Sequence, residues 1–332
     1  MQLDVLIATF NRADLLPHAL ESLLEAEKPE ALELHVTVID NRSTDDTRAV
    51  VESFASRFAG RLHYLYERKP GKSYALNAGI AATSGELVGM IDDDERVDRT
   101  WLQTIATAFA DPATDFVGGP YRPLWGAERP IWLGRAYGSA IGWTESGHGK
   151  QQFGPPCELM LMGGNAVIRR SVLERVGPYA TDVGRTPGRL LSCEDEDMFA
   201  RLIAAGARGF YRPDLVIHHY VPPERLTKRY FRRWCFWRGV SRAVLDRRRP
   251  APVRYLLGVP RYMVGLAVRG TIDTVRSLGR GAKPAQTFAN ELAWWDLAGF
   301  VYGKYSYYLE RSVNRVIHRG QPRGSAASNH AN

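Results

Sequence analysis

Hydrophobic and polar residues alternate along the first 120 residues in a way that predicts strands and helices in turn. Apolar runs predict strands at residues 3–9, 34–40, 62–66, 86–92 and 116–119. The segments between them predict helices at residues 13–24, 43–58, 72–82 and 101–110. This alternation is typical of an α/β fold with a mostly parallel central sheet covered by helices.

The pattern changes between residues 121 and 156, where Pro, Gly, Trp and Tyr dominate and no period is evident. Loops of this length in a compact domain are usually functional. The periodicity then returns. It predicts a strand at residues 159–169 interrupted by two glycines, a helix within residues 192–205, and short strands at residues 209–211 and 215–218.

A different composition begins after Pro223. Residues 225–245 predict a basic helix rich in aromatic side chains, and residues 293–309 form a further aromatic segment. The apolar stretch 255–268 is broken by Pro, Arg and Gly, and is too short for a membrane span, which needs about 20 apolar residues. We therefore expect a domain over residues 1–222, a helical basic-aromatic extension over 223–319, and a disordered tail over 320–332.

The composition is that of a globular protein, with 45% hydrophobic and 24% charged residues among 332. The three cysteines are far apart in the sequence, which argues against a disulfide framework and favours a reducing cytosol. The N-terminus enters a strand pattern at once and has no basic segment before it, so we expect no signal peptide.

The charge is distributed unevenly. Residues 1–227 contain 24 basic and 31 acidic side chains, whereas residues 228–332 contain 20 and 5. A basic half indicates an anionic partner surface. The extension has no recognised nucleic-acid-binding module, so we expect no nucleic acid partner. Its many Trp and Tyr residues suit the headgroup region of a bilayer, so an anionic membrane surface is the partner we expect. The alternative is that these aromatic side chains pack onto the catalytic domain or a second subunit.

The main candidate for chemistry is the acidic run that follows the apolar run Leu87–Ile91. Ligands of open α/β sheets bind at the carboxyl ends of such strands, where Asp92, Asp93 and Asp94 would lie. Clustered carboxylates repel one another unless a cation joins them, and Mg²⁺ or Mn²⁺ prefers one or two carboxylates with phosphate oxygens. The alternative is a solvated acidic turn.

Other polar residues follow the first two strands: Thr9, Asn11 and Arg12 after one, and Asp40 after the next. Asp40 suits a hydrogen bond to a base or ribose, with helix capping as its alternative. Lys72 follows Gly71 at a predicted helix start, which is a typical anion site, although the first glycine of a P-loop is missing.

Two later motifs also suit catalysis. Glu194 and Asp195 open a predicted helix, where a partly buried carboxylate with a raised pKa makes a general base; the alternative is an ordinary acidic first turn. His218 and His219 are possible metal ligands or satisfied structural histidines.

Taken in order, these motifs resemble the family 2 glycosyltransferases with the GT-A fold. The resemblance covers about residues 3–240 and rests on the order of seven short motifs. They are Ile7–Arg12, Val38–Thr47, Gly71–Ile80, Ile91–Asp94, Gly163–Asn165 with Arg169-Arg170, Glu194-Asp195 with Asp197 and Arg201, and His218-His219. One departure is Leu76, where many relatives carry Arg, so Lys72 or Lys69 is expected to replace that diphosphate contact.

The resemblance implies an inverting hexosyltransferase-type enzyme that uses a nucleotide-diphospho-sugar. Residues 1–120 would be the nucleotide-sugar half of the catalytic domain and residues 121–222 the acceptor half. Asp195, with Glu194 beside it, would be the catalytic base. Asp94, Asp92 and His219 would hold Mg²⁺ or Mn²⁺, with His219 matching better than His218. The expected nucleotide-sugar contacts are Thr9, Asn11, Arg12, Asp40, Lys72, Asn77, Asp92 and Asp93.

The resemblance and the basic extension together indicate where such an enzyme would act. We expect a saccharide or polyprenyl-linked saccharide acceptor, in cell-envelope polysaccharide or lipid-linked glycan synthesis. The protein would be cytoplasmic and peripheral on the inner face of the plasma membrane. The alternative is a catalytically idle relative that acts as a membrane-bound scaffold or sugar-binding subunit. The intact acidic residues at both motifs favour the enzyme.

Overall fold

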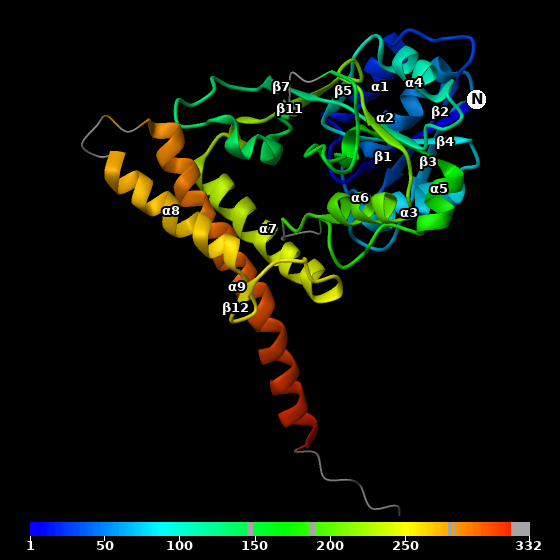
Figure 1. The fold of residues 1–332 in the computed structure, drawn as a ribbon. Coiled ribbons are helices and arrows are strands. Elements are labelled where there is room, and N and C mark those ends of the chain that lie inside the picture. Colours follow the sequence, from blue (N-terminus) through cyan, green and yellow to red (C-terminus); the bar gives the residue numbers. More distant parts are fainter. Residues whose placement is uncertain (145–148, 186–189, 278–280, 282, 320–332) are drawn as a thin grey trace, which may run out of the picture.

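A twisted, mostly parallel sheet organises the first two thirds of the chain (Figure 1). The computed structural model describes residues 1–144, 149–185, 190–277, 281 and 283–319, and within these residues the sheet has eight strands in the order β3-β2-β1-β4-β9-β6-β10-β8. The strands are β1 (Gln2–Thr9), β2 (Glu33–Asp40), β3 (Leu62–Tyr66), β4 (Leu87–Asp92), β6 (Phe116–Gly118), β8 (Gln151–Gln152), β9 (Ala166–Arg169) and β10 (Gly209–Tyr211). The predicted fold class is confirmed.

The register of the central strands aligns their polar ends. β1 pairs in parallel with β2 and β4, so that Thr9 lies opposite Asp40 and Ala8 lies opposite Asp92. Only β9 and β8 run antiparallel to their neighbours in this sheet. The carboxyl ends of three parallel strands therefore meet at one edge, as the sequence predicts.

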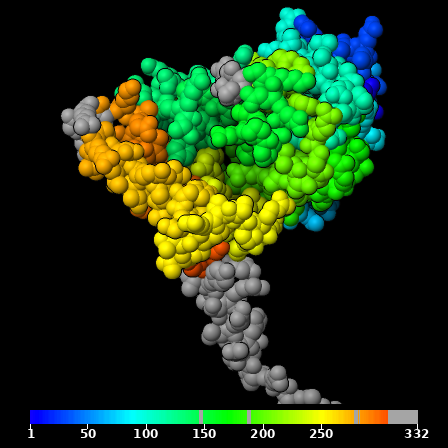
Figure 2. Space-filling view, viewed as in Figure 1, coloured from blue at the N-terminus to red at the C-terminus, as the bar shows by residue number. Residues whose placement is uncertain are grey.

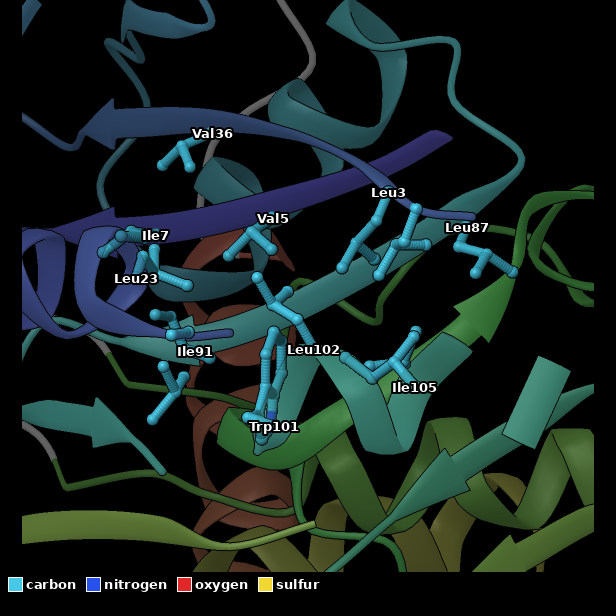
Figure 3. Packing of buried hydrophobic residues seen from close by; sticks show 14 of the residues in the cluster. Leu3, Val5, Ile7, Leu23, Val36, Leu87, Ile91, Trp101, Leu102 and Ile105 are labelled. Carbon is cyan, nitrogen blue, oxygen red and sulfur yellow. The ribbon is translucent and has the colours of Figure 1, made fainter. Parts of the chain in front are cut away.

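Successive residues of β1 contribute to two separate apolar layers, as the period of a strand requires. Leu3, Val5 and Ile7 pack with Trp101 and other buried residues on one face (Figure 3). Leu6 packs on the other face. The first layer is covered by α1 (Leu16–Glu25), α2 (Thr47–Phe54) and α4 (Trp101–Phe109), and the second by α3 (Lys72–Ala82), α5 (Arg170–Val176) and α6 (Glu194–Ala204) (Figure 1).

A smaller sheet lies beside the first, with strand order β5-β11-β7. Its strands are β5 (Glu95–Val97), β11 (Ile217–Val221) and β7 (Tyr121–Trp125). β11 pairs antiparallel with β5, so that His219 lies opposite Glu95. This sheet brings the second histidine of the late motif to the acidic turn after β4.

The structure corrects several predicted boundaries. The strand predicted over 159–169 is confined to β9, because Gly163–Asn165 form a 3₁₀ turn, η3. The helix predicted from residue 43 begins at Thr47, since Ser43 and Asp45 accept hydrogen bonds from the backbone of Asn11 and Ala13. Residues 170–176 and the 3₁₀ segment η2 (Arg135–Ile141) are helical without having been predicted.

Three helices form the C-terminal extension (Figure 1). They are α7 (Lys228–Arg248), α8 (Arg261–Ser277) and α9 (Pro284–Arg319), with a small hairpin of β12 (Tyr255–Leu256) and β13 (Val259–Pro260) before α8. α7 and α9 approach closely at two glycines, which have no Cβ atom. A Cβ atom at Gly239 would overlap the carbonyl oxygen of Asp296, and a Cβ atom at Gly299 would overlap that of Phe236. The helix predicted from Arg225 begins at Lys228 instead.

No helix within the described residues is long and apolar enough to cross a bilayer. The predicted tail 320–332 lies outside the described residues.

Candidate active site

A cavity of about 210 Å³ opens at the carboxyl ends of β1 and β4. We call it the strand-end cavity. It is lined by Ala8, Thr9, Phe10, Arg12, Asn41, Gly71, Lys72, Asp92, Asp93, Asp94, Arg185 and Arg225. Five of the predicted nucleotide-sugar residues, together with Asp94, therefore share one space.

A second cavity, of about 130 Å³, adjoins the first. We call it the acidic cavity, because Asp92, Glu95, Glu194, Asp195 and Glu196 all line it. Lys72, Asp92 and Arg185 line both cavities. The two spaces therefore meet at one lysine, one aspartate and one arginine.

Lys72 forms an ion pair with Asp92 at this junction. It is the first residue of α3, and its backbone N–H donates to the carbonyl oxygen of Arg185 (3.1 Å). Burial alone would lower the pKa of Lys72, but Asp92, Asp195 and Glu194 outweigh it and hold that pKa above its ordinary value. Lys72 therefore stays cationic and supplies charge to both cavities.

Asp94 lies between two basic side chains. Its Oδ2 atom is 3.0 Å from Nη2 of Arg225, and its Oδ1 atom is 3.5 Å from Nε2 of His219. Burial opposes ionisation, but His219 and Arg225 hold the pKa of Asp94 well below its usual range. Burial and the neighbouring Asp94 raise the pKa of Asp93 to about 7. The acidic run thus contains one firmly ionised carboxylate beside one that is half protonated at neutral pH.

The donor set around Asp94 is compatible with a divalent cation. Burial lowers the pKa of His219, so its imidazole is neutral, and its Nδ1 atom is buried without a hydrogen-bond partner in the described part of the chain. In that same part no three His, Cys, Asp or Glu side chains lie close enough together to enclose a metal by themselves. A cation on Asp92 and Asp94 would therefore need further oxygen ligands, which a diphosphate offers.

Glu194 and Asp195 begin α6, and the preceding Cys193 adopts φ of 81° to turn the chain into that helix. The carboxylate of Asp195 lies directly against Gly163. A Cβ atom at residue 163 would overlap Oδ1 of Asp195. Burial and then Asp195 raise the pKa of Glu194 to about 7. Burial also raises the pKa of Asp195, against the opposing effect of Lys72. Glu194 is thus suited to exchange a proton near neutral pH, and Asp195 binds a proton more readily than an ordinary aspartate.

The predicted Gly-Gly-Asn motif makes room for two carboxyl groups. A Cβ atom at Gly164 would overlap Oε1 of Glu95, as one at Gly163 would overlap Asp195. Asn165 fixes the turn: its Oδ1 accepts from Nε1 of Trp101 (3.0 Å), and its Nδ2 donates to the carbonyl oxygen of Leu215 (2.7 Å). The motif therefore shapes the acidic cavity through its backbone.

Three predicted nucleotide-sugar residues do not line the strand-end cavity. Both ends of the Asn77 amide bond to the backbone of Tyr179 (2.9 and 2.8 Å), so Asn77 ties α3 to a distant loop. Asn11 accepts from the backbone N–H of Thr44 (2.7 Å) and holds the turn after β2. In this structure both side chains act as structural ties, and their assignment as nucleotide-sugar contacts stays a prediction.

Asp40 is buried and bonds within the protein. Its Oδ1 accepts from the backbone N–H of Ser43 (2.7 Å), and its Oδ2 accepts from the Tyr64 hydroxyl (2.6 Å). Asp40 therefore holds the turn after β2 and does not cap the next helix, which begins at Thr47. The neighbouring Asn41 lines the cavity instead and bonds to the backbone N–H of Gly71 (2.6 Å), which positions the start of α3.

Sequence reasoning missed three site residues: Glu95, Arg185 and Arg225. Glu95 is buried, accepts a hydrogen bond from the backbone N–H of Asp92 (2.7 Å), and has a pKa raised well above its ordinary value by burial and by Asp92. Its place directly after the acidic run was a usable signal. Arg185 lies in an irregular segment and Arg225 ends the 3₁₀ turn η4 (Pro223–Arg225), and at neither place does periodicity give information.

The C-terminal extension forms part of the acidic cavity. Trp234 and Arg238 of α7 line it. The backbone N–H of Ser192, three residues before Asp195, donates to Oγ of Ser241 in α7 (2.9 Å). Asp296 of α9 holds Arg238 (2.9 Å) and Arg242 (3.0 Å) of α7. Ser241 and Asp296 therefore support the acidic cavity from beyond the region in which the sequence resembles the family.

Residues 4–177 match the family model described as "Glycosyl transferase family 2". The chain belongs to this family. The prediction made from its motifs is confirmed, and the chain is a glycosyltransferase that takes sugar from a nucleotide sugar.

Two curated relatives cover most of their own length. The chain is 27% identical to the succinoglycan biosynthesis protein ExoM of Rhizobium meliloti, over 70% of this chain and 72% of that one. It is 28% identical to the glucosyl-dolichyl phosphate glucuronosyltransferase of Haloferax volcanii, over 74% and 78%.

A solved structure supports the fold. The mannosyltransferase PcManGT of Pyrobaculum calidifontis, in complex with GDP-Man and Mn²⁺, has 20% identity and a TM-score of 0.59 over 92% of this chain and 87% of that one. This similarity concerns the GT-A fold alone.

Proposed function

We propose that this glycosyltransferase transfers a hexose from a nucleotide-diphospho-sugar to an acceptor hydroxyl with inversion, and that the transfer depends on a divalent metal. The observation that carries the proposal is the junction of the two cavities at Lys72, Asp92 and Arg185. A donor in the strand-end cavity would place its anomeric carbon at that junction. The acceptor would approach from the acidic cavity.

The strand-end cavity supplies contacts suited to a nucleotide diphosphate. Arg12, Lys72 and Arg185 provide positive charge, and the hydroxyl of Thr9, which has no partner within the described residues, provides a polar group for the base or ribose. Lys72 takes the place of the arginine that Leu76 replaces, since Leu76 is buried in the apolar layer under α3.

Asp92 and Asp94, with neutral His219 beside them, would hold Mg²⁺ or Mn²⁺. When bound, the metal would neutralise the charge that develops on the leaving diphosphate. The ring nitrogen of His219 that faces Asp94 is Nε2, and a cation held here would take its remaining ligands from the donor. The solved structure of PcManGT likewise contains both a nucleotide sugar, GDP-Man, and a metal ion, Mn²⁺.

Asp195 would remove the proton from the acceptor hydroxyl, and Glu194 would share in the titration of the pair. Direct displacement places the attacking oxygen and the leaving group on opposite sides of the sugar, which is the geometry of inversion. Asp195 lines the acidic cavity and the Asp94 carboxylate lines the other, so base and leaving-group sites lie on different sides of the junction.

For the acceptor we propose a saccharide or a polyprenyl-linked saccharide. The names of the two relatives point to a polysaccharide and to a dolichyl-linked sugar. Trp234 in the wall of the acidic cavity offers an aromatic surface of the kind that packs on a sugar ring. The catalytic domain would then comprise residues 1–222, with α7 completing its acceptor side.

We further propose that the extension rests on the cytoplasmic face of an anionic membrane. α8 exposes Leu266, Val268, Ile272 and Val275, and the hairpin before it exposes Leu256 and Leu257. Arg261, Arg269 and Arg276 are also exposed on α8. α8 lies on the outer surface of the molecule (Figure 2). Val268, Ile272 and Val275 lie on one side of α8, and an exposed apolar stripe flanked by arginines is typical of an interfacial helix.

The test is turnover of UDP-, GDP- and dTDP-sugars with Mn²⁺, first by hydrolysis without acceptor and then with saccharide acceptors. Metal-dependent turnover of one donor, with the opposite anomeric configuration in the product, supports the proposal. A chain that binds a sugar nucleotide but turns over none of them would instead be an idle relative acting as a sugar-binding subunit.

A further inference from the structure

One face of α7 combines three arginines with two aromatic side chains. Arg229, Arg232, Arg233, Phe236 and Trp237 follow the spacing of a single helical stripe. Together with Trp295 of α9 they line a cavity of about 330 Å³. None of these six residues lines the strand-end or the acidic cavity. We call this space the arginine-aromatic cavity.

The cavity carries positive charge that is not fully balanced. Glu291 of α9 accepts two hydrogen bonds from Arg232, at 2.6 and 3.0 Å, which fixes the guanidinium against the cavity wall. Arg229 and Arg233 are exposed and form no ion pair within the described residues. No acidic side chain lines the cavity itself. Two arginines are therefore available to an anion.

The remaining walls are aromatic. Phe236 and Trp237 are half-buried, and Trp295 is 40% exposed. The indole of Trp295 is held in place because its Nε1 donates to Oε1 of Glu291 (3.1 Å), and the Phe236 ring lies 5.5 Å from that of Tyr302. A ligand that fits this cavity has an anionic end for the guanidinium groups and an apolar part for the rings.

From this geometry we propose that the arginine-aromatic cavity binds the phosphate headgroup of an anionic membrane lipid. Arginine pairs with phosphate through two parallel hydrogen bonds, and Trp residues prefer the boundary between headgroups and acyl chains. The inference rests on the proposed membrane association and names a specific partner site for it. Because Trp234 and Arg238 on another face of α7 line the acidic cavity, a lipid bound here would hold the acceptor wall at the bilayer surface.

The experiment measures binding of the full chain to vesicles of phosphatidylcholine with and without phosphatidylglycerol. The double variant R229S/R233S should bind the anionic vesicles about thirty-fold more weakly than wild type, since each arginine near such a surface contributes a factor of about five. The variant R99S/R175S is the matched control, because it removes the same charge from exposed positions outside this cavity. It should bind like wild type.

A second variant tests the aromatic wall without changing the charge. Trp295→Ala should also weaken binding to anionic vesicles, whereas attraction by net charge alone would leave it unaffected. Equal binding by wild type, R229S/R233S and W295A overturns the inference. So does equal weakening in R99S/R175S.

Free phosphate must be distinguished from lipid. Inorganic phosphate titrated into the wild-type chain should neither bind tightly nor displace it from the vesicles. Full displacement would reassign the cavity to a soluble phosphate and overturn the lipid assignment. Failure of the proposed transferase activity would appear differently, as a wild-type chain that turns over no nucleotide sugar with or without vesicles.

Discussion

Gly163 and Asp195 are in such close contact that no side chain at residue 163 is compatible with the present position of the carboxylate. Gly163→Ala should therefore displace Asp195 and lower kcat by about 10–100-fold, as small misplacements of catalytic groups do. Donor affinity should be kept, because Gly163 does not line the strand-end cavity. Gly149→Ala is the control, since nothing lies within 4 Å of a Cβ there. Equal kcat in both variants would separate the glycine from catalysis.

Replacing the proposed base itself should have a larger effect. Asp195→Asn should lower kcat by about 10²–10⁴-fold, the range for loss of a general base. The nucleotide dissociation constant should change little, because Asp195 lines only the acidic cavity. Asp197→Asn, which loses the pairing with Arg201, is the nearest comparison on the same helix. Loss of nucleotide affinity with normal kcat would move Asp195 to the donor side.

The pH dependence of kcat/KM should report the same pair of carboxyl groups. A base works only when deprotonated, so the rate should fall as pH drops through its pKa. Because burial and Asp195 raise the pKa of Glu194 to about 7, and burial raises that of Asp195, the acid limb should lie near neutral pH. Lys72→Met removes a charge that lowers both pKa values, so the limb should move to higher pH. A limb at the ordinary carboxyl range, about pH 4, would contradict this.

Asp94→Asn should abolish transfer and lower the melting temperature. The substitution removes the charge that Arg225 and His219 face in a buried position, and breaking a buried ion pair costs about 3–5 kcal/mol. Thermal unfolding with and without Mn²⁺ checks the metal assignment, because the variant should lose any stabilisation by Mn²⁺. Asp214→Asn, which loses an ion pair of a half-exposed carboxylate with Arg212 outside the two cavities, should keep the wild-type response to Mn²⁺. Turnover of D94N near the wild-type rate would remove Asp94 from the metal site.

Asp296→Asn tests whether α9 supports the acceptor side. The change weakens the hold on Arg238 and Arg242, so α7 should shift and transfer to acceptor should fall by about tenfold or more. Hydrolysis of the donor without acceptor should persist, because neither Arg238 nor Arg242, the two residues that Asp296 holds, lines the strand-end cavity. The ratio of the two rates is the measurement. A parallel loss of both would indicate general unfolding instead.

The predictable part of the site came from regular structure. Asp92 and Lys72 meet because parallel strands end at a common edge and a helix begins beside that edge. The apolar run before Asp92 indicates the strand, and the glycine before Lys72 indicates the start of the helix. Arg225 was placed in a helix that begins three residues later, since a basic residue after two prolines gives no periodic signal. The bond from Asn77 to Tyr179 could not be predicted, because the two residues are 102 apart in the sequence and no local pattern connects them.

The close approach of α7 and α9 at Gly239 and Gly299 has an evolutionary consequence. The family match ends at residue 177, whereas the α7 wall of the acidic cavity is built from residues after 227 and braced by α9. Under the proposed function, one wall of the acceptor cavity is thus encoded after residue 227, whereas every residue that lines the strand-end cavity precedes it. Exchange of the C-terminal stretch between relatives would redirect the enzyme to another acceptor while its donor pocket is inherited intact.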